Sequence, residues 1–130
     1  MFAELFALLY VAHLAADYPL QTDHQAAHKA DSSAAGWRAN LVHAGTHVAA
    51  CGVALALAAV LLDQSAGVWP SVTALAWIGG THAFIDRRWP IRWWMENTGQ
   101  EEFIKHGGAA HVDQAVHVIA LAVAALWMAA

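Results

Sequence analysis

Residues 39–62 read ANLVHAGTHVAACGVALALAAVLL, a run of 24 residues without a charged side chain. A helix of this length rises about 36 Å, and the hydrocarbon core of a bilayer is about 30 Å thick. The run is rich in Ala and Leu and lacks the alternation of apolar and polar residues that is typical of a strand. It therefore predicts a helix that crosses a membrane.

Three more apolar stretches accompany it, at residues 2–17, 68–86 and 109–129. The last two are long enough to span a bilayer, and the first is short, which predicts a shallow or tilted helix. Proline and glycine mark the boundaries between the stretches. We expect an all-α fold in which residues 1–130 form a single integral membrane domain. This domain would be a four-transmembrane-helix bundle of up–down topology, with helices at about 2–17, 39–62, 68–86 and 109–129.

Composition supports this class and argues against others. Hydrophobic residues make up 59% of the chain and charged residues 12%, whereas a soluble domain of this size needs roughly 25–35% charge on its surface. The net charge of −4 predicts no nucleic-acid binding. The single cysteine, Cys51, is interpreted as a small buried residue. The first stretch lacks a basic segment before it and a cleavage site after it, so we expect a retained helix.

The basic residues predict an orientation. All six lie in the two long connections, at residues 18–38 and 87–108, which share one side of a four-span bundle. The positive-inside rule makes that side cytoplasmic and places both termini and the link at residues 63–67 outside. Tryptophans gather at the ends of the stretches, as in an aromatic belt. Residues 90–105 are amphipathic, which favours either a helix along the inner interface or a solvated loop.

Histidine and aspartate recur in pairs four residues apart. The chain has 9 His and 6 Asp, and random placement would give roughly 1.7 such pairs. Five pairs occur, one in each apolar stretch and one in a polar connection. They are His13/Asp17, His43/His47, His82/Asp86, Asp113/His117 and His24/His28. This spacing puts both side chains of a pair on one face of a helix.

The four pairs in the apolar stretches share one end of the predicted bundle. Two come at C-terminal ends of their helices and two at N-terminal ends, so up–down topology brings all eight residues to the cytoplasmic end. Aspartate in a membrane helix costs roughly 2.5–3.5 kcal/mol at the centre and less near an end. Five imidazoles and three carboxylates suffice for two divalent ions, with zinc favoured and manganese or iron as alternatives. A cluster held by hydrogen bonds alone remains the other interpretation.

Neighbouring polar residues extend the predicted site. Gln21 and Gln114 are candidates to hold the ligands by hydrogen bonds. Asp17 and Asp113 are the candidate general bases, and the sequence does not separate them. Four basic residues are candidates to bind an anionic head group of a substrate, or serve only to orient the chain in the membrane. They are Lys29, Arg38, Arg87 and Arg88.

The same residues carry a resemblance. The segment His13-Leu14-Ala15-Ala16-Asp17-Tyr18-Pro19-Leu20-Gln21 resembles the opening motif of a small bacterial and phage membrane-protein family catalogued as domain of unknown function 3307. Lys29 fits the basic residue that follows. The His43/His47 pair and the segments 82–86 and 113–117 resemble its later motifs. The resemblance covers nearly the whole chain and implies a location in the bacterial inner membrane. A looser similarity to membrane-bound metal-dependent hydrolases implies hydrolysis.

Three functions follow from these patterns. The first is a membrane-embedded, metal-dependent hydrolase that acts at the cytoplasmic interface on a lipid-linked or phosphate-bearing substrate. The second is a metal-ion or proton transporter or sensor, which the apolar outer half of each stretch disfavours. The third is a non-catalytic accessory protein with a hydrogen-bonded cluster. Membrane lipid is the expected surrounding, and association of copies into a homo-oligomer is left open.

Overall fold

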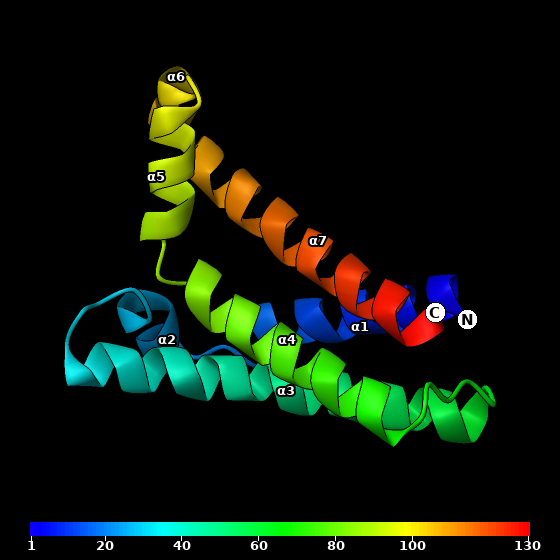
Figure 1. Ribbon diagram of the computed structural model, residues 1–130. Coiled ribbons are helices and arrows are strands. Elements are labelled where there is room, and N and C mark those ends of the chain that lie inside the picture. The colour runs from blue at the N-terminus through cyan, green and yellow to red at the C-terminus, as the bar shows by residue number, and fades with distance from the viewer.

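The computed structural model describes residues 1–130, and all of its regular structure is helical (Figure 1). This confirms the predicted all-α class. The helices are α1 (Phe2–Asp17), α2 (Asp23–His28), α3 (Ala34–Leu61), α4 (Val68–Ile85), α5 (Trp89–Asn97), α6 (Glu101–Lys105) and α7 (Gly108–Ala129).

Four of the helices form the bundle. Helix α1 packs against α3 and α7, and α4 packs against the same two helices. The short helix α2 lies on α3, whereas α5 and α6 lie on α7. Figure 1 shows the two chain termini together at the end of the bundle opposite α2, α5 and α6. The four predicted stretches are therefore four helices of one bundle, joined alternately at its two ends.

Two helices, α3 and α7, are long and apolar enough to cross a membrane. Helix α1 has 16 residues and α4 has 18, and neither meets that test. Length and composition alone do not distinguish a membrane span from the core helix of a soluble protein. The four-span topology and its orientation therefore stay predictions.

Helix boundaries follow local capping chemistry. Helix α3 begins five residues before its predicted start, because the Ser33 hydroxyl accepts a hydrogen bond from the backbone N–H of Gly36. The unpredicted helix α2 begins with a capping box, in which Thr22 and Gln25 bond to each other's backbone N–H groups. Residues 90–105 form most of α5 and α6 rather than a loop, with Pro90 in the first turn of α5.

The His/Asp pairs lie between two apolar clusters. The larger cluster fills the half of the bundle near the termini and includes Leu9, Cys51, Ile78 and Leu121. The smaller one joins Ile85 at the end of α4 to Ile91 and Met95 of α5. Cys51 is fully buried in the larger cluster, which confirms its interpretation as a small core residue. The polar groups of the bundle are thus enclosed by apolar packing on both sides.

Candidate metal centre

The four bundle helices bring histidine and aspartate side chains into two overlapping groups with metal-ligand spacing. The first, called here the Asp17 group, consists of Asp17, His43, His47 and His82. The second, the Asp86 group, consists of His82, Asp86 and His117. Within each group the potential ligand atoms lie within 4.8 Å of one another, and every member is buried. Six of the eight predicted ligands are therefore assembled, and His82 belongs to both groups.

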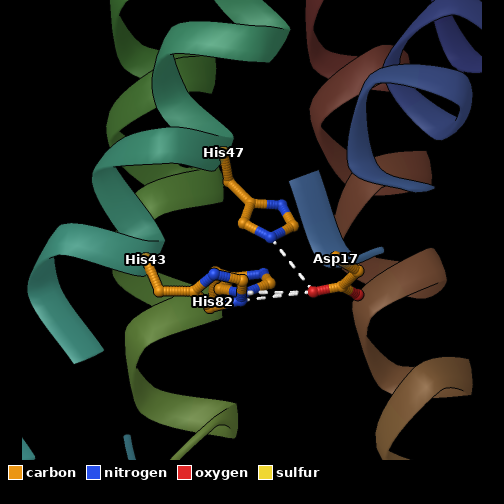
Figure 2. A group of neighbouring side chains, drawn as sticks. All are labelled: Asp17, His43, His47 and His82. Carbon is orange, nitrogen blue, oxygen red and sulfur yellow. Dashed lines mark hydrogen bonds and ion pairs between the residues drawn. The ribbon is translucent and has the colours of Figure 1, made fainter. Parts of the chain in front are cut away.

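In the Asp17 group, three imidazoles converge on one carboxylate oxygen (Figure 2). The Oδ1 atom of Asp17 lies 3.2 Å from His43 Nε2, 3.1 Å from His47 Nε2 and 3.9 Å from His82 Nε2. Zinc–ligand bonds of about 2.0–2.1 Å at tetrahedral angles place ligand atoms about 3.3 Å apart. The three separations from Asp17 Oδ1 lie near that value, so the group could hold one metal ion.

The second oxygen of Asp17 is held by neighbours outside the group. The Nε2 atom of His13 lies 3.1 Å from Asp17 Oδ2, and the side-chain amide of Gln114 donates a hydrogen bond to the same oxygen at 3.1 Å. These contacts fix the plane of the carboxylate and leave Oδ1 directed at the three imidazoles. His13, predicted as a ligand, therefore lies beside the ligand groups, and Gln114 occupies the supporting position predicted for it.

The Asp86 group contains buried polar atoms without hydrogen-bond partners. His117 Nδ1 is 2.9 Å from the backbone oxygen of Asp113, so in the neutral ring Nδ1 carries the proton and Nε2 keeps a lone pair. That Nε2 faces Asp86 Oδ1 at 4.0 Å and has no hydrogen-bond partner. Oδ2 of Asp86 lies 3.1 Å from His82 Nε2 and 3.0 Å from the Lys29 ammonium. The Asp86 carboxylate therefore already has a cation beside it, and the Nε2 lone pair of His117 remains available to a metal.

The donor set could hold a divalent metal ion. Imidazole nitrogens mixed with carboxylate oxygens suit zinc, manganese or iron. Nδ1 of His43 and Nδ1 of His47 are buried without a partner. This holds in the metal-bound and the hydrogen-bonded interpretation alike, because in each one it is Nε2 that faces Asp17. The unpartnered Nε2 of His117 is the atom that hydrogen bonds leave unsatisfied.

The other predicted residues lie at varied distances from the groups. Asp113 lies next to His117, with Oδ2 3.5 Å from its Nδ1, and is 21% exposed. Gln21 donates to the backbone oxygen of Asp17 rather than to its carboxylate. Arg38 is exposed on α3, and buried Arg87 donates to the backbone oxygens of Lys29 and Asp31.

Lys29 contacts the ligand groups themselves, although the sequence predicted it only as a candidate to bind a substrate head group. Its Nζ is 3.0 Å from Asp86 Oδ2 and 3.2 Å from His43 Nε2. Its position after the polar helix α2 gave no sign of this contact, because the contact depends on the path of the connection. Among the basic residues, the family resemblance alone singled out Lys29, and it did not place this residue in the centre.

The family match agrees with the motifs that carry the centre. A family model described as "Protein of unknown function (DUF3307)" matches residues 5–130. The chain belongs to this family. Comparison with curated proteins and comparison with solved structures give no match. The DUF3307 match therefore includes every residue of both ligand groups, and it confirms the family resemblance of the sequence motifs.

A cavity of about 650 Å³ opens beside the centre of this DUF3307 chain. Its polar wall includes Lys29, Asp86 and Asp113, so it reaches the ligand groups directly. Arg88 and Arg92 add positive charge, and Arg92 was not among the predicted site residues. The remaining wall is largely apolar and includes Ile91, Ile104, Ala109 and Ala110. The cavity thus extends from the buried ligand groups to an opening whose wall is basic and apolar.

We expect the Gln114→Ala substitution to weaken metal binding by roughly 10–100-fold, because it frees the Asp17 carboxylate to rotate away from the three imidazoles. The dissociation constant for Zn²⁺, measured by chelator competition on the detergent-purified protein, tests this. Gln21→Ala is the matched control, since Gln21 bonds only to backbone near Asp17. Equal affinities in the two variants would contradict the supporting role of Gln114.

Proposed function

We propose that this chain is an integral membrane protein whose centre holds a divalent transition metal and hydrolyses a lipid-linked, phosphate-bearing substrate at the cytoplasmic interface. The observation that carries the proposal is the convergence of three buried imidazole nitrogens on one oxygen of Asp17. The unpartnered Nε2 of His117, which faces Asp86 Oδ1 at 4.0 Å, supports it as well. Zinc is the preferred ion because its tetrahedral geometry suits the Asp17 group, with manganese and iron as alternatives.

Exposed apolar side chains support the membrane part of the proposal. Large hydrophobic residues are exposed along the outward faces of α3, α4 and α7, far more than a soluble protein of this size leaves in water. They include Val53, Leu57, Val60, Leu61, Val68, Trp69, Val72, Ile119, Leu126 and Trp127. In the proposed topology all four bundle helices cross the bilayer, with the shorter α1 and α4 tilted or shallow. The basic connections and the centre then face the cytoplasm.

The proposed reaction is hydrolysis, because the centre combines candidate metal ligands with a carboxylate, that of Asp113, which belongs to neither ligand group. A bound divalent metal supplies a Lewis acid and lowers the pKa of water toward neutrality. Asp113 is the preferred general base, since it lines the cavity and is 21% exposed. Asp17 is less suited, because its Oδ1 faces three imidazoles and its Oδ2 contacts His13 and Gln114. The geometry thus favours Asp113 over Asp17 as the general base, a choice that the sequence left open.

The cavity supports a substrate that is both anionic and apolar. Lys29, Arg88 and Arg92 offer positive charge to a phosphate group. The apolar wall formed by α5, α6 and the start of α7 accommodates the first part of a lipid chain. Arg88 is held toward the cavity by a bond from its guanidinium to the backbone oxygen of Ala26 and by a left-handed backbone, with φ of 63°. Arg38 lines a different cavity and Arg87 is buried against backbone oxygens, so Arg88 and Lys29 are the preferred head-group residues.

Transport is the weaker candidate. The half of the bundle near the termini contains only apolar buried residues, among them Leu5, Leu9, Ile78, Leu121 and Met128. An ion that left the centre toward that end would meet no polar group inside the bundle, and its desolvation would be costly. This packing favours an enzyme or a binding protein that exchanges its ligands through the basic end.

Metal content of the detergent-purified protein tests the centre. We expect stoichiometric transition metal in the wild type and a loss of at least half of it in His47→Ala, because His47 supplies one of four ligands. Inductively coupled plasma mass spectrometry of metal-equilibrated, desalted protein gives the ratio. His24→Ala is the control, since His24 is exposed on α2 outside both groups. A wild type without bound metal would end the proposal.

Hydrolytic activity is tested by Asp113→Asn, which keeps the size of the side chain and removes its basicity. We expect kcat on phosphoester lipids to fall by roughly 10²–10⁴-fold while metal content stays unchanged. Asp63→Asn is the matched control in the exposed link between α3 and α4. A metal-loaded wild type that cleaves no phosphoester would leave metal binding intact and refute hydrolysis of this substrate class.

A further inference from the structure

The ammonium of Lys29 lies inside the metal centre although its backbone belongs to a peripheral connection. Lys29 follows the last residue of α2, and its side chain is only 12% exposed. Its Nζ forms an ion pair with Asp86 Oδ2 at 3.0 Å and lies 3.2 Å from His43 Nε2. It therefore contacts one carboxylate of the Asp86 group and one imidazole of the Asp17 group.

Two arginines hold the Lys29 backbone in place. Arg87 donates to the backbone oxygens of Lys29, at 2.9 Å, and of Asp31, at 2.6 Å. Arg88 donates to the backbone oxygen of Ala26 at 3.1 Å. The guanidinium of Arg87 also stacks on Trp37, 4.2 Å from the ring centroid. Because these arginines directly follow Asp86 in the chain, the segment that carries Lys29 is fixed relative to its ion-pair partner.

The two ligand groups cannot both be completed by protein ligands alone. Nε2 of His82 lies 3.9 Å from Asp17 Oδ1 and 3.1 Å from Asp86 Oδ2, so both groups draw on the same nitrogen, and one imidazole lone pair serves one metal. If His82 completes the Asp17 group, an ion in the Asp86 group has two protein ligands, Asp86 and His117, and water completes its shell. Such an ion depends on the Asp86 carboxylate, with which Lys29 pairs in the wild type.

Charge balance also favours a single ion. Asp17, Asp86 and Asp113 bring three negative charges to the centre and its edge. One divalent ion together with the Lys29 ammonium brings three positive charges. A second divalent ion in addition to Lys29 would leave an excess of two positive charges in a buried site, which is costly without further anions.

We propose that Lys29 is the resident cation of the Asp86 group, so that the wild-type chain binds one divalent ion, in the Asp17 group, and excludes a second. This inference rests on the proposed metal centre and departs from the two ions that the sequence predicted. Lys29 also lines the substrate cavity. In two-metal phosphoesterases the second metal balances charge on the substrate phosphate. Lys29 takes over that role here.

The number of bound ions tests the inference. Detergent-purified protein is equilibrated with excess Zn²⁺, desalted and analysed for zinc per chain by mass spectrometry. We expect one ion in the wild type and two in Lys29→Met, in which the Asp86 carboxylate has lost its cation. Lys29→Arg keeps the positive charge and should hold one. Lys105→Met, which removes an exposed lysine on α6, should also hold one.

The outcomes separate this inference from the metal centre itself. One ion or fewer in Lys29→Met, with one in the wild type, overturns the role of Lys29 and leaves the centre intact. Two ions in the wild type overturn it as well, whatever the variants show. No ion in the wild type refutes the centre. If Lys29→Met does not fold, Lys29→Gln replaces it. Two ions in Lys29→Gln support the role of Lys29, and one ion or fewer overturns it.

Discussion

The burial of two carboxylates, those of Asp17 and Asp86, is the constraint on which the rest of the structure depends. Each side chain is less than one-tenth exposed, and removing a carboxylate from water costs several kcal/mol unless charge and hydrogen bonds compensate. All four bundle helices supply that compensation. Helix α1 offers His13, α3 offers His43 and His47, α4 offers His82, and α7 offers Gln114 and His117. The polar chemistry thus fixes which ends of the helices meet.

The short connecting segments serve the same centre from outside the bundle. Helix α2 is capped at its start by Thr22 and Gln25, and its far end is held by Arg87 and Arg88, so Lys29 is delivered to Asp86. Helix α5 packs Ile91 and Met95 on the end of α4 and forms one wall of the cavity. These segments therefore limit access to the centre and provide the basic surface next to it.

Much of the arrangement could be predicted, because spacing and topology are local properties of the sequence. The pairs four residues apart, placed at alternate helix ends, predicted convergence of the four helices, and six of the eight residues form the ligand groups. The capping box at Thr22 could also have been recognised in the sequence, but it was not predicted. The overlap of the groups at His82 and the entry of Lys29 could not be predicted. Both depend on side-chain direction and on the path of a connection, which periodicity does not encode.

The ligands of a bound metal would show whether the Asp17 group is a metal site. X-ray absorption spectroscopy of the zinc-loaded, detergent-purified protein reports ligand type and distance. We expect about four nitrogen or oxygen ligands at about 2.0–2.1 Å, with the outer-shell scattering of about three imidazoles. A sulfur ligand from Cys51, or a shell without imidazole, would contradict it.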